Sequence, residues 1–561
     1  METSNFANYT RVEPDLEEIQ KRYNVLFERI HSATDSEACL AAVKDWDRLL
    51  QELTEWSQLT QTRFYQDTEN PDYKAAQDRL DFIWPKYLDL ETQMKRKFLE
   101  SPFRADLQKA TSPQLFNLWQ CKIQTFDPKI EEDLTKESKL SSEYTALIAT
   151  AQLDFNGKSL TLSEIGQYFE DPNRATRKLA YEVRSAWFAN NAASLDQIYD
   201  KQVQLRDSMA RKLGCQNFIE LGYQRMPRIG YGPEEVSAFR AEVKREVVPL
   251  CNHLATAQAQ KLGVETLMHW DESIYNPNGN PKPQGGHDWM IERAREMFKQ
   301  MGHGLDGFFE NMLTQGLLDL KSRKGKGAGG FCAFFPLLSY PFIFANFNGT
   351  RADVNVFTHE MGHAFQVWSS RRLPMSEMAW PTTEACEIHS MALEFLSWPW
   401  MGLFYGEKAA EELRKIHLTS SIMFIPYGVS IDLFQHMVYE HPEASPEDRN
   451  AMWQEIEQTY LPWYHYGELS APSSGRLWQM KQHIYSSPFY YIDYTLALTG
   501  ALQFWRKSQV NHELALTDYV QLCRRGGTLP FSALLESAGL HSPFSEGCLK
   551  NVIADARRYL F

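Results

Sequence analysis

Residues 353–373, DVNVFTHEMGHAFQVWSSRRL, contain the pattern that decides the fold and the chemistry of this chain. The segment is predicted to form one helix. In the pentad His359-Glu360-Met361-Gly362-His363, the two histidines are four residues apart, so both lie on one helical face and can bind one metal ion. Glu360 follows the first histidine, where it can reach a metal-bound water as a general base. The pentad therefore predicts a metal-dependent hydrolase.

The composition narrows the possible partners. The 561 residues are 43% hydrophobic and carry a net charge of −14 that is spread along the chain, which argues against nucleic-acid binding. No run approaches the ~20 apolar residues of a membrane span. The eight cysteines are scattered without a C-x-x-C pair, and the first residues show no secretory signal. These features predict a cytoplasmic protein in a reducing compartment, and they predict no oligomeric state.

Apolar residues at spacings of three and four predict a mainly α-helical chain. A change of composition near Phe155-Asn156-Gly157 suggests a boundary, dividing an N-terminal helical region, 1–160, from a catalytic region, 161–561. The expected helices are 37–67, 72–99, 174–190, 195–213 and 233–262.

The clearest β-signal comes directly before the pentad. Phe331–Phe335 and Tyr340–Phe347 are aromatic runs of strand length. An exposed strand edge beside the metal helix would hold an extended peptide by backbone pairing, and a fully paired hairpin is the alternative. The preceding basic, glycine-rich segment 321–330 is either a turn or a flap over the site. Thr350 and Asp353 resemble a capping box that begins the helix.

A third metal ligand is expected from a second helix, 382–396, which offers several candidates. Glu384, Glu387 and Glu394 share one side of this helix, whereas His389 points elsewhere. The spacing does not separate Glu384 from Glu387. One or two of these carboxylates are alternatively expected only to orient the imidazoles. Cys386 is expected to be a small buried residue beside the site.

The segments FIFANFNGT (342–350) and THEMGHAFQ (358–366) resemble the M3 metallopeptidases, most closely the oligoendopeptidase F branch related to thimet oligopeptidase and neurolysin. In that family the third ligand begins an E-x-x-S motif that is followed by another Glu. Glu387, Ser390 and Glu394 match this pattern, so the resemblance selects Glu387 and implies one Zn²⁺ per chain. His389 departs from thimet-type members, which have Pro there.

The resemblance extends to segment 483–494, HIYSSPFYYIDY, which is similar to the family's His- and Tyr-rich loop. It implies that His483, Tyr491 and Tyr494 bind the substrate carbonyl and the developing oxyanion, with Tyr485 and Tyr490 as substitutes. It also implies two helical lobes around a deep substrate channel, with a small β-sheet beside the zinc-binding helix.

These observations together predict a zinc endopeptidase that hydrolyses internal bonds of short peptides. His359, His363 and Glu387 would bind zinc, and Glu360 would activate the water and then protonate the leaving amine. The alternatives are a zinc carboxypeptidase or dipeptidyl carboxypeptidase of the same helical class, and an inactive peptide-binding protein. Retention of Glu360 and of all three ligands argues against the last.

Overall fold

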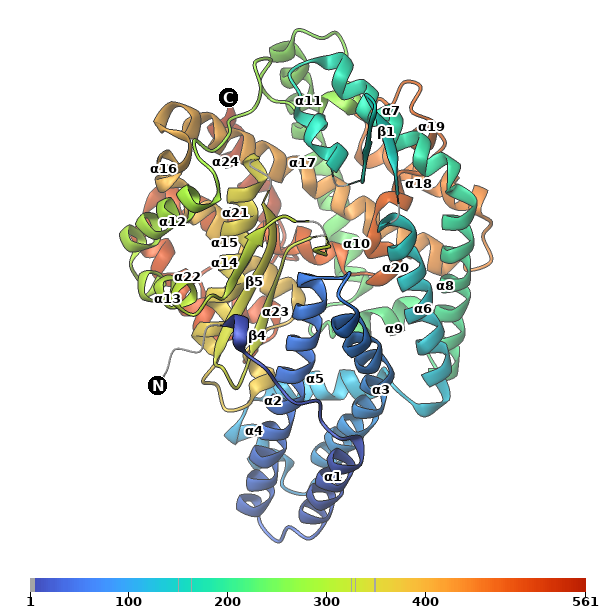
Figure 1. Ribbon diagram of the computed structural model, residues 1–561, viewed down its shortest axis with the longest axis vertical. Helices are drawn as coiled ribbons and strands as arrows, with labels where there is room; N and C mark the ends of the chain where they lie inside the picture. The colour runs from blue at the N-terminus through green and yellow to red at the C-terminus, as the bar shows by residue number, and fades with distance from the viewer. Residues whose placement is uncertain (1–5, 150, 163, 324, 328, 348–349) are drawn as a thin grey trace. The chain divides into compact units, whose positions relative to one another are not determined.

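A computed structural model describes residues 6–149, 151–162, 164–323, 325–327, 329–347 and 350–561. It is 71% helical with two small sheets, which confirms the mainly α-helical prediction (Figure 1). The chain divides into two compact units, each assembled from three stretches. Unit 1 comprises residues 1–128, 283–407 and 500–542, and unit 2 comprises residues 129–282, 408–499 and 543–561.

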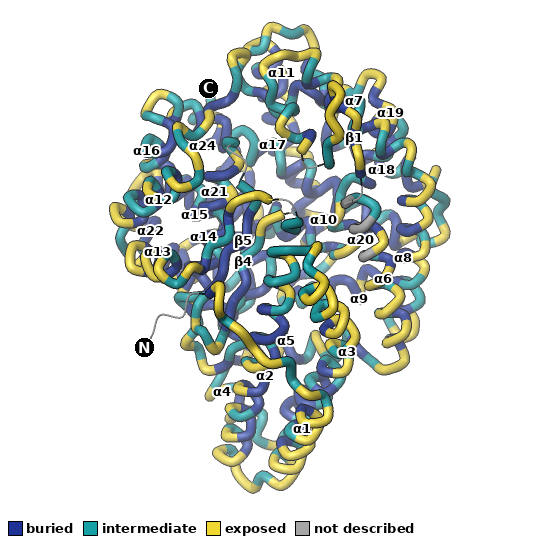
Figure 2. Tube along the Cα trace, viewed as in Figure 1, coloured by how far each residue is buried: buried dark blue, intermediate teal, exposed yellow. Residues whose placement is uncertain are grey.

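The N-terminal helices of unit 1 follow the predicted bounds to within one residue. The 37–67 prediction corresponds to α2 (Ser36–Gln66) and the 72–99 prediction to α3 (Pro71–Leu99). Asp35 and Asn70 cap these two helices with their side chains. Buried and exposed positions alternate along α1 (Leu16–His31), α2 and α3, as amphipathic helices require (Figure 2). Trp46, Phe98 and Trp119 meet in their core with ring centroids 5.4–5.8 Å apart.

The three-stranded sheet of unit 1 contains both predicted strands. β5 (Tyr340–Phe347) lies in the centre, antiparallel to β4 (Phe331–Phe335) and parallel to β3 (Leu318–Lys321). The sequence missed β3, whose four residues contain no aromatic or β-branched side chain. Since β5 is paired on both sides, only β4 and β3 have an outer edge in this sheet. Of the two predicted strands, β4 is therefore the one whose edge could pair with an extended peptide.

The pentad helix α14 (Arg351–Ser370) follows β5 and packs against β4, β5 and α15 (Thr383–Leu396). Thr350 is its N-cap, but the predicted capping box is wrong because the Thr350 side chain makes no capping hydrogen bond. The other elements of unit 1 are η1 (Phe6–Asn8), α1 (Leu16–His31), α4 (Arg104–Ala110), α5 (Pro113–Gln124), α12 (His287–Met301), α13 (Leu305–Thr314), η6 (Ser376–Met378), η7 (Trp398–Trp400), α16 (Gly402–Tyr405), α22 (His512–Arg525) and α23 (Phe531–Ser537).

Unit 2 contains the remaining predicted helices. They are α7 (Arg174–Asn190), α8 (Ala192–Leu213), and the 233–262 segment, in which a π-helical turn (Val243–Val247) separates α10 (Pro233–Glu242) from α11 (Val248–Leu262). The change of composition near residue 160 is a short hairpin, β1 (Leu153–Phe155) and β2 (Lys158–Leu160).

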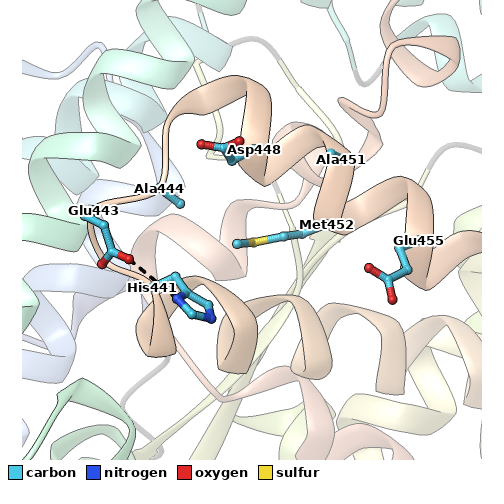
Figure 3. A pocket seen from close by; sticks show the side chains of 7 residues that line it. All are labelled: His441, Glu443, Ala444, Asp448, Ala451, Met452 and Glu455. Carbon is cyan, nitrogen blue, oxygen red and sulfur yellow. Dashed lines mark ion pairs between the residues drawn. The ribbon is translucent and has the colours of Figure 1, made fainter.

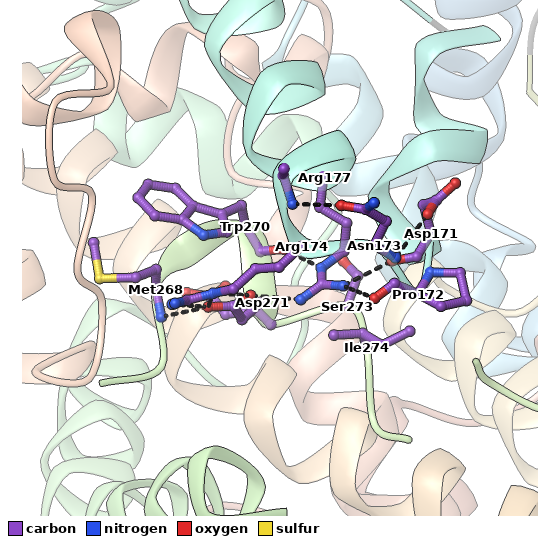
Figure 4. A network of polar contacts seen from close by, with 12 residues as sticks. Asp171, Pro172, Asn173, Arg174, Arg177, Met268, Trp270, Asp271, Ser273 and Ile274 are labelled. Carbon is purple, nitrogen blue, oxygen red and sulfur yellow. Dashed lines mark hydrogen bonds and ion pairs between the residues drawn. The ribbon is translucent and has the colours of Figure 1, made fainter. Parts of the chain in front are cut away.

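Buried ion pairs fasten the helices of unit 2 to their neighbours. Figure 4 shows one such network: Arg174 and Arg177 of α7 pair with the buried Asp271 of η5 (His269–Asp271) at 2.7 and 2.6 Å. The other elements are α6 (Glu131–Ala149), η3 (Glu164–Glu170), α9 (Phe218–Arg225), α18 (Pro446–Tyr460), α19 (Ser470–Ser473), η8 (Leu477–Met480), α20 (Gln482–Ser486) and α24 (Cys548–Leu560). η2 (Pro128–Ile130), α17 (Glu407–Glu440) and α21 (Tyr491–Val510) cross the unit boundaries. No helix in the described part of the chain is long and apolar enough to span a membrane.

Candidate metal centre

The two predicted histidine ligands lie on one face of α14, one turn apart. The ring centroids of His359 and His363 are 5.1 Å apart and the rings are nearly perpendicular. α15 packs directly alongside this face and contributes Glu387. The ligand atoms of the three residues lie within 4.8 Å of one another, and within the described residues they form the only group of three with metal-ligand geometry.

The distances in this group fit a single small cation. Glu387 Oε2 is 3.3 Å from His359 Nε2 and 3.4 Å from His363 Nε2. Three protein ligands of the His₂Glu type, with a fourth position left to a water or substrate, are the usual donor set of a catalytic zinc ion. The residues therefore fit a metal ion of this kind, and their assignment as ligands stays a prediction.

Two further side chains of α15 orient the ligands. Glu394 Oε1 is 2.8 Å from His359 Nδ1, which turns Nε2 of that imidazole toward Glu387. Ser390 donates from Oγ to Glu387 Oε2 at 2.9 Å, which fixes the carboxylate. The spacing of Glu387, Ser390 and Glu394 thus has a local reason, because the three residues share one helical face. Among the acidic residues considered for an orienting role, Glu394 is in contact with an imidazole of the group.

The electrostatics of the group suit proton transfer and cation binding. Burial raises the pKa of Glu360 above its ordinary value, and the two imidazoles oppose this rise only partly. Burial also opposes ionisation of Glu387, but the adjacent imidazoles outweigh it and hold the pKa of that carboxyl well below its usual range. Glu387 is thus ionised as a ligand must be, whereas Glu360 has the more basic carboxylate that a proton acceptor needs.

Two glycines permit close approach around the centre. A Cβ at Gly362, the fourth residue of the pentad, would lie 2.5 Å from the carbonyl oxygen of His389, so a side chain there would push α15 away. A Cβ at Gly330, just before β4, would lie 3.3 Å from Glu360 Oε1. Gly330 is the last residue of the segment predicted to be either a turn or a flap over the site. The start of β4 therefore adjoins the predicted general base.

Three residues near Glu387 are separate from the ligand group. Glu384 is buried one turn earlier on α15 and is not in it. His389 lies 2.7 Å from the carbonyl oxygen of Ala385 through Nδ1, and burial lowers its pKa to about 4, so it is a neutral core residue. Cys386 donates from Sγ to the carbonyl oxygen of Pro381 at 3.4 Å.

The predicted substrate-binding loop lies in unit 2, on α20 and the beginning of α21. Tyr494 Oη is 3.5 Å from His483 Nε2, and the Tyr490 ring stacks on His483 with an interplanar angle of 7°. Tyr491 stands edge-on to His483 at 5.2 Å. Tyr485, by contrast, is fully buried against Tyr144 at 3.9 Å and is a core residue. The loop thus brings His483, Tyr490, Tyr491 and Tyr494 together without Tyr485.

A surface pocket of about 420 Å³ also occurs in unit 2, at the end of α17 and along α18. Figure 3 shows its lining, which is acidic apart from one histidine and three small or apolar residues: His441, Glu443, Ala444, Asp448, Ala451, Met452 and Glu455. None of these residues belongs to the group with metal-ligand geometry. Within the described residues, the lining of the pocket therefore contains no group with metal-ligand geometry.

The sequence of the chain matches two models of a known peptidase family. The family model "Peptidase M3 N-terminal domain" matches residues 6–126, and "Peptidase family M3" matches residues 167–285 and 291–552. The chain belongs to peptidase family M3. The predicted family, and with it a metal-dependent endopeptidase, is confirmed.

Several relatives of this M3 peptidase carry the name oligoendopeptidase F. The chain is similar to an oligoendopeptidase F from Lactococcus lactis subsp. cremoris (21% identity over 92% of this chain and 94% of the relative). Among solved structures it resembles an oligoendopeptidase F from Bacillus anthracis (41% identity, 99% and 98% coverage, TM-score 0.91). It also resembles Pz peptidase A with an inhibitor (40% identity, 99% of both chains, TM-score 0.96).

Proposed function

We propose that this M3 peptidase is a zinc-dependent oligopeptidase, which cleaves internal bonds of short peptides. The observation that carries the proposal is the group formed by His359, His363 and Glu387, with Glu360 adjoining it on α14. Imidazole and carboxylate donors suit zinc, and three of them are typical of catalytic zinc. The names of the similar proteins support oligopeptides as substrates. The cysteine pattern supports a cytoplasmic location.

The residues divide the hydrolysis between them. Zinc, when bound, supplies a Lewis acid that polarises the scissile carbonyl. Glu360 accepts a proton from the attacking water while the oxygen of that water forms a bond to the carbonyl carbon. Glu360 then delivers this proton to the amine nitrogen as the C–N bond breaks. Its raised pKa suits both steps.

We keep the predicted roles of the loop on α20 and α21. His483 and the hydroxyls of Tyr491 and Tyr494 would donate hydrogen bonds to the substrate carbonyl oxygen as negative charge develops there. The short approach between His483 and Tyr494 supports these two as a pair. The division of the chain at residue 160 and the substrate channel also remain our proposals.

The test combines metal analysis with product mapping. Zinc content and cleavage of an internally quenched peptide, blocked at both ends, are measured for the natural chain, Glu360→Gln and the exposed control Glu28→Gln. We expect Glu360→Gln to keep zinc and to lose activity by about 100-fold or more, whereas Glu28→Gln changes neither. Full activity of Glu360→Gln contradicts the mechanism. Cleavage that requires a free C-terminus would identify a carboxypeptidase.

A further inference from the structure

Lys481 lies between η8 and α20 of unit 2 and approaches two tyrosines, one on α17 and one on α21. Its Nζ is 5.2 Å from the ring centroid of Tyr427 on α17 and 5.1 Å from that of Tyr491 at the start of α21. Lys481 and Tyr427 are both partly accessible, whereas Tyr491 is 5% exposed. The ammonium group therefore lies close to two phenol rings, on a side chain that is not fully buried.

Within the described chain, Lys481 lacks the carboxylate partner that four buried arginines of the unit have. Carboxylates lie within 3.0 Å of Arg177, Arg206, Arg228 and Arg240. Among the described residues of unit 2, Lys481 makes no such ion pair; its recorded interactions are with the phenols of Tyr427 and Tyr491. Burial disfavours its charge, but these interactions outweigh burial, so the pKa of Lys481 lies above its ordinary value. It is therefore charged at neutral pH.

Burial withdraws part of the water from this charged group, and the two phenol rings compensate for that loss only in part. Each phenol oxygen that accepts a hydrogen bond from the ammonium still has its own O–H to donate. These three side chains thus present an ammonium and two hydroxyl donors, and no carboxylate in the described part of unit 2 is paired with the ammonium. A carboxylate, with its two acceptor oxygens and one negative charge, complements this set.

We propose that Lys481, Tyr427 and Tyr491 form a subsite that binds a carboxylate of the peptide substrate. This inference rests on the proposed peptidase function. Tyr491 also contacts the residues predicted to bind the substrate carbonyl, because its ring lies 5.2 Å from His483 and 5.5 Å from Tyr494. The carboxylate subsite is thereby continuous with the loop that would hold the substrate backbone. The carboxylate comes either from the peptide C-terminus or from an Asp or Glu side chain.

The test compares three quenched peptides. Two share one neutral sequence, one with a free C-terminus and one amidated, and the third is the amidated peptide with Glu placed after the scissile bond. Each is assayed with the natural chain, Lys481→Met, Lys481→Arg and the exposed control Lys415→Met. Binding of the same peptides to a Glu360→Gln background is measured by calorimetry, which does not require turnover. Circular dichroism confirms that each variant is folded.

We expect the natural chain to prefer at least one carboxylate-bearing peptide over the neutral one by about tenfold or more in kcat/KM and in affinity. Lys481→Met should lose this preference with little change for the neutral peptide, Lys481→Arg should retain part of it, and Lys415→Met should retain all. The preferred peptide identifies the source of the carboxylate.

Other outcomes overturn the subsite. Equal treatment of all three peptides by the natural chain excludes it without any variant. An equal loss for all three peptides in Lys481→Met would instead assign Lys481 to the positioning of Tyr491. If the Glu360→Gln background binds a carboxylate-bearing peptide in preference to the neutral one but the natural chain cleaves none of the three, the proposed peptidase function fails and the subsite stands.

Discussion

Gly362 offers the sharpest test of how the metal centre is built. A Cβ at this position would lie 2.5 Å from the carbonyl oxygen of His389, 2.6 Å from Ser390 Cα and 3.0 Å from the carbonyl carbon of His389. All three are backbone atoms of α15, so no side-chain rotation relieves the overlap. Ordinary contact begins at 3.4 Å, and 3.4 − 2.5 leaves a shortfall of about 0.9 Å. In Gly362→Ala, α15 must therefore move away from α14.

Two opposing effects set the stability of this variant. Alanine favours a helix by about 1 kcal/mol over glycine, whereas overpacking of a close contact costs about 1–3 kcal/mol. We therefore expect a net loss of stability of about 0–2 kcal/mol. The effect on the metal should be larger, since ligand distances tolerate only about 0.2 Å. A shift of α15 carries Glu387 away from His359 and His363, and zinc affinity should fall by about 100-fold or more.

The assay pairs unfolding with metal competition. Urea unfolding midpoints are measured on the metal-free protein, and zinc affinity is measured against a chelator. Gly307→Ala is the matched control, because Gly307 is an exposed residue of α13 and a Cβ there meets nothing within 4 Å. It should be stabilised by about 0.5–1 kcal/mol and should bind zinc normally. If Gly362→Ala behaves like this control in both measurements, the close contact does not position Glu387.

Two other substitutions test neighbouring features. Glu394→Gln removes the charged partner of His359 Nδ1, so zinc affinity should fall by about 10–100-fold in the same competition assay, and an unchanged affinity would exclude the orienting role. Burial raises the pKa of Glu457 to about 7, so its neutral form stabilises the fold fully below about pH 4.5, and this contribution is lost as pH rises through 7. Glu457→Gln should therefore match the natural chain at pH 5 and exceed its stability at pH 8, by about 3 kcal/mol at most. Parallel unfolding midpoints of the two proteins at both pH values would contradict this.

The parts of the fold with strong periodicity could be predicted from the sequence. Long amphipathic helices such as α2 and α7 have apolar spacing and caps that fix their ends locally, and the aromatic runs of β4 and β5 are similarly distinct. β3 could not be predicted because its four residues gain strand structure only by pairing with β5. The division into two units was also hidden, since each unit joins stretches that are distant in sequence.

The tyrosines of segment 483–494 likewise could not be told apart from the sequence. Four tyrosines in one short segment have equivalent chemistry, and the sequence does not tell which ring enters the core. Tyr485 is held by stacking on Tyr144, a residue of α6 that lies more than 300 positions earlier. Tyr494 instead approaches His483. Only tertiary packing separates the two, because the contacts that decide between them are not local.

The choice between Glu384 and Glu387 has one physical origin, the register of α15 against α14. Both residues share a helical face in the sequence, so periodicity treats them alike. The contact of Gly362 with the backbone at His389 and Ser390 fixes where along α15 the two helices touch. Glu387 lies just before this contact and faces both imidazoles, while Glu394 lies one turn beyond it and reaches His359 Nδ1. Gly362 of the pentad and the E-x-x-S motif of α15 therefore act together to position Glu387. A substitution that displaces α15 from α14 should impair the metal centre as severely as loss of a ligand.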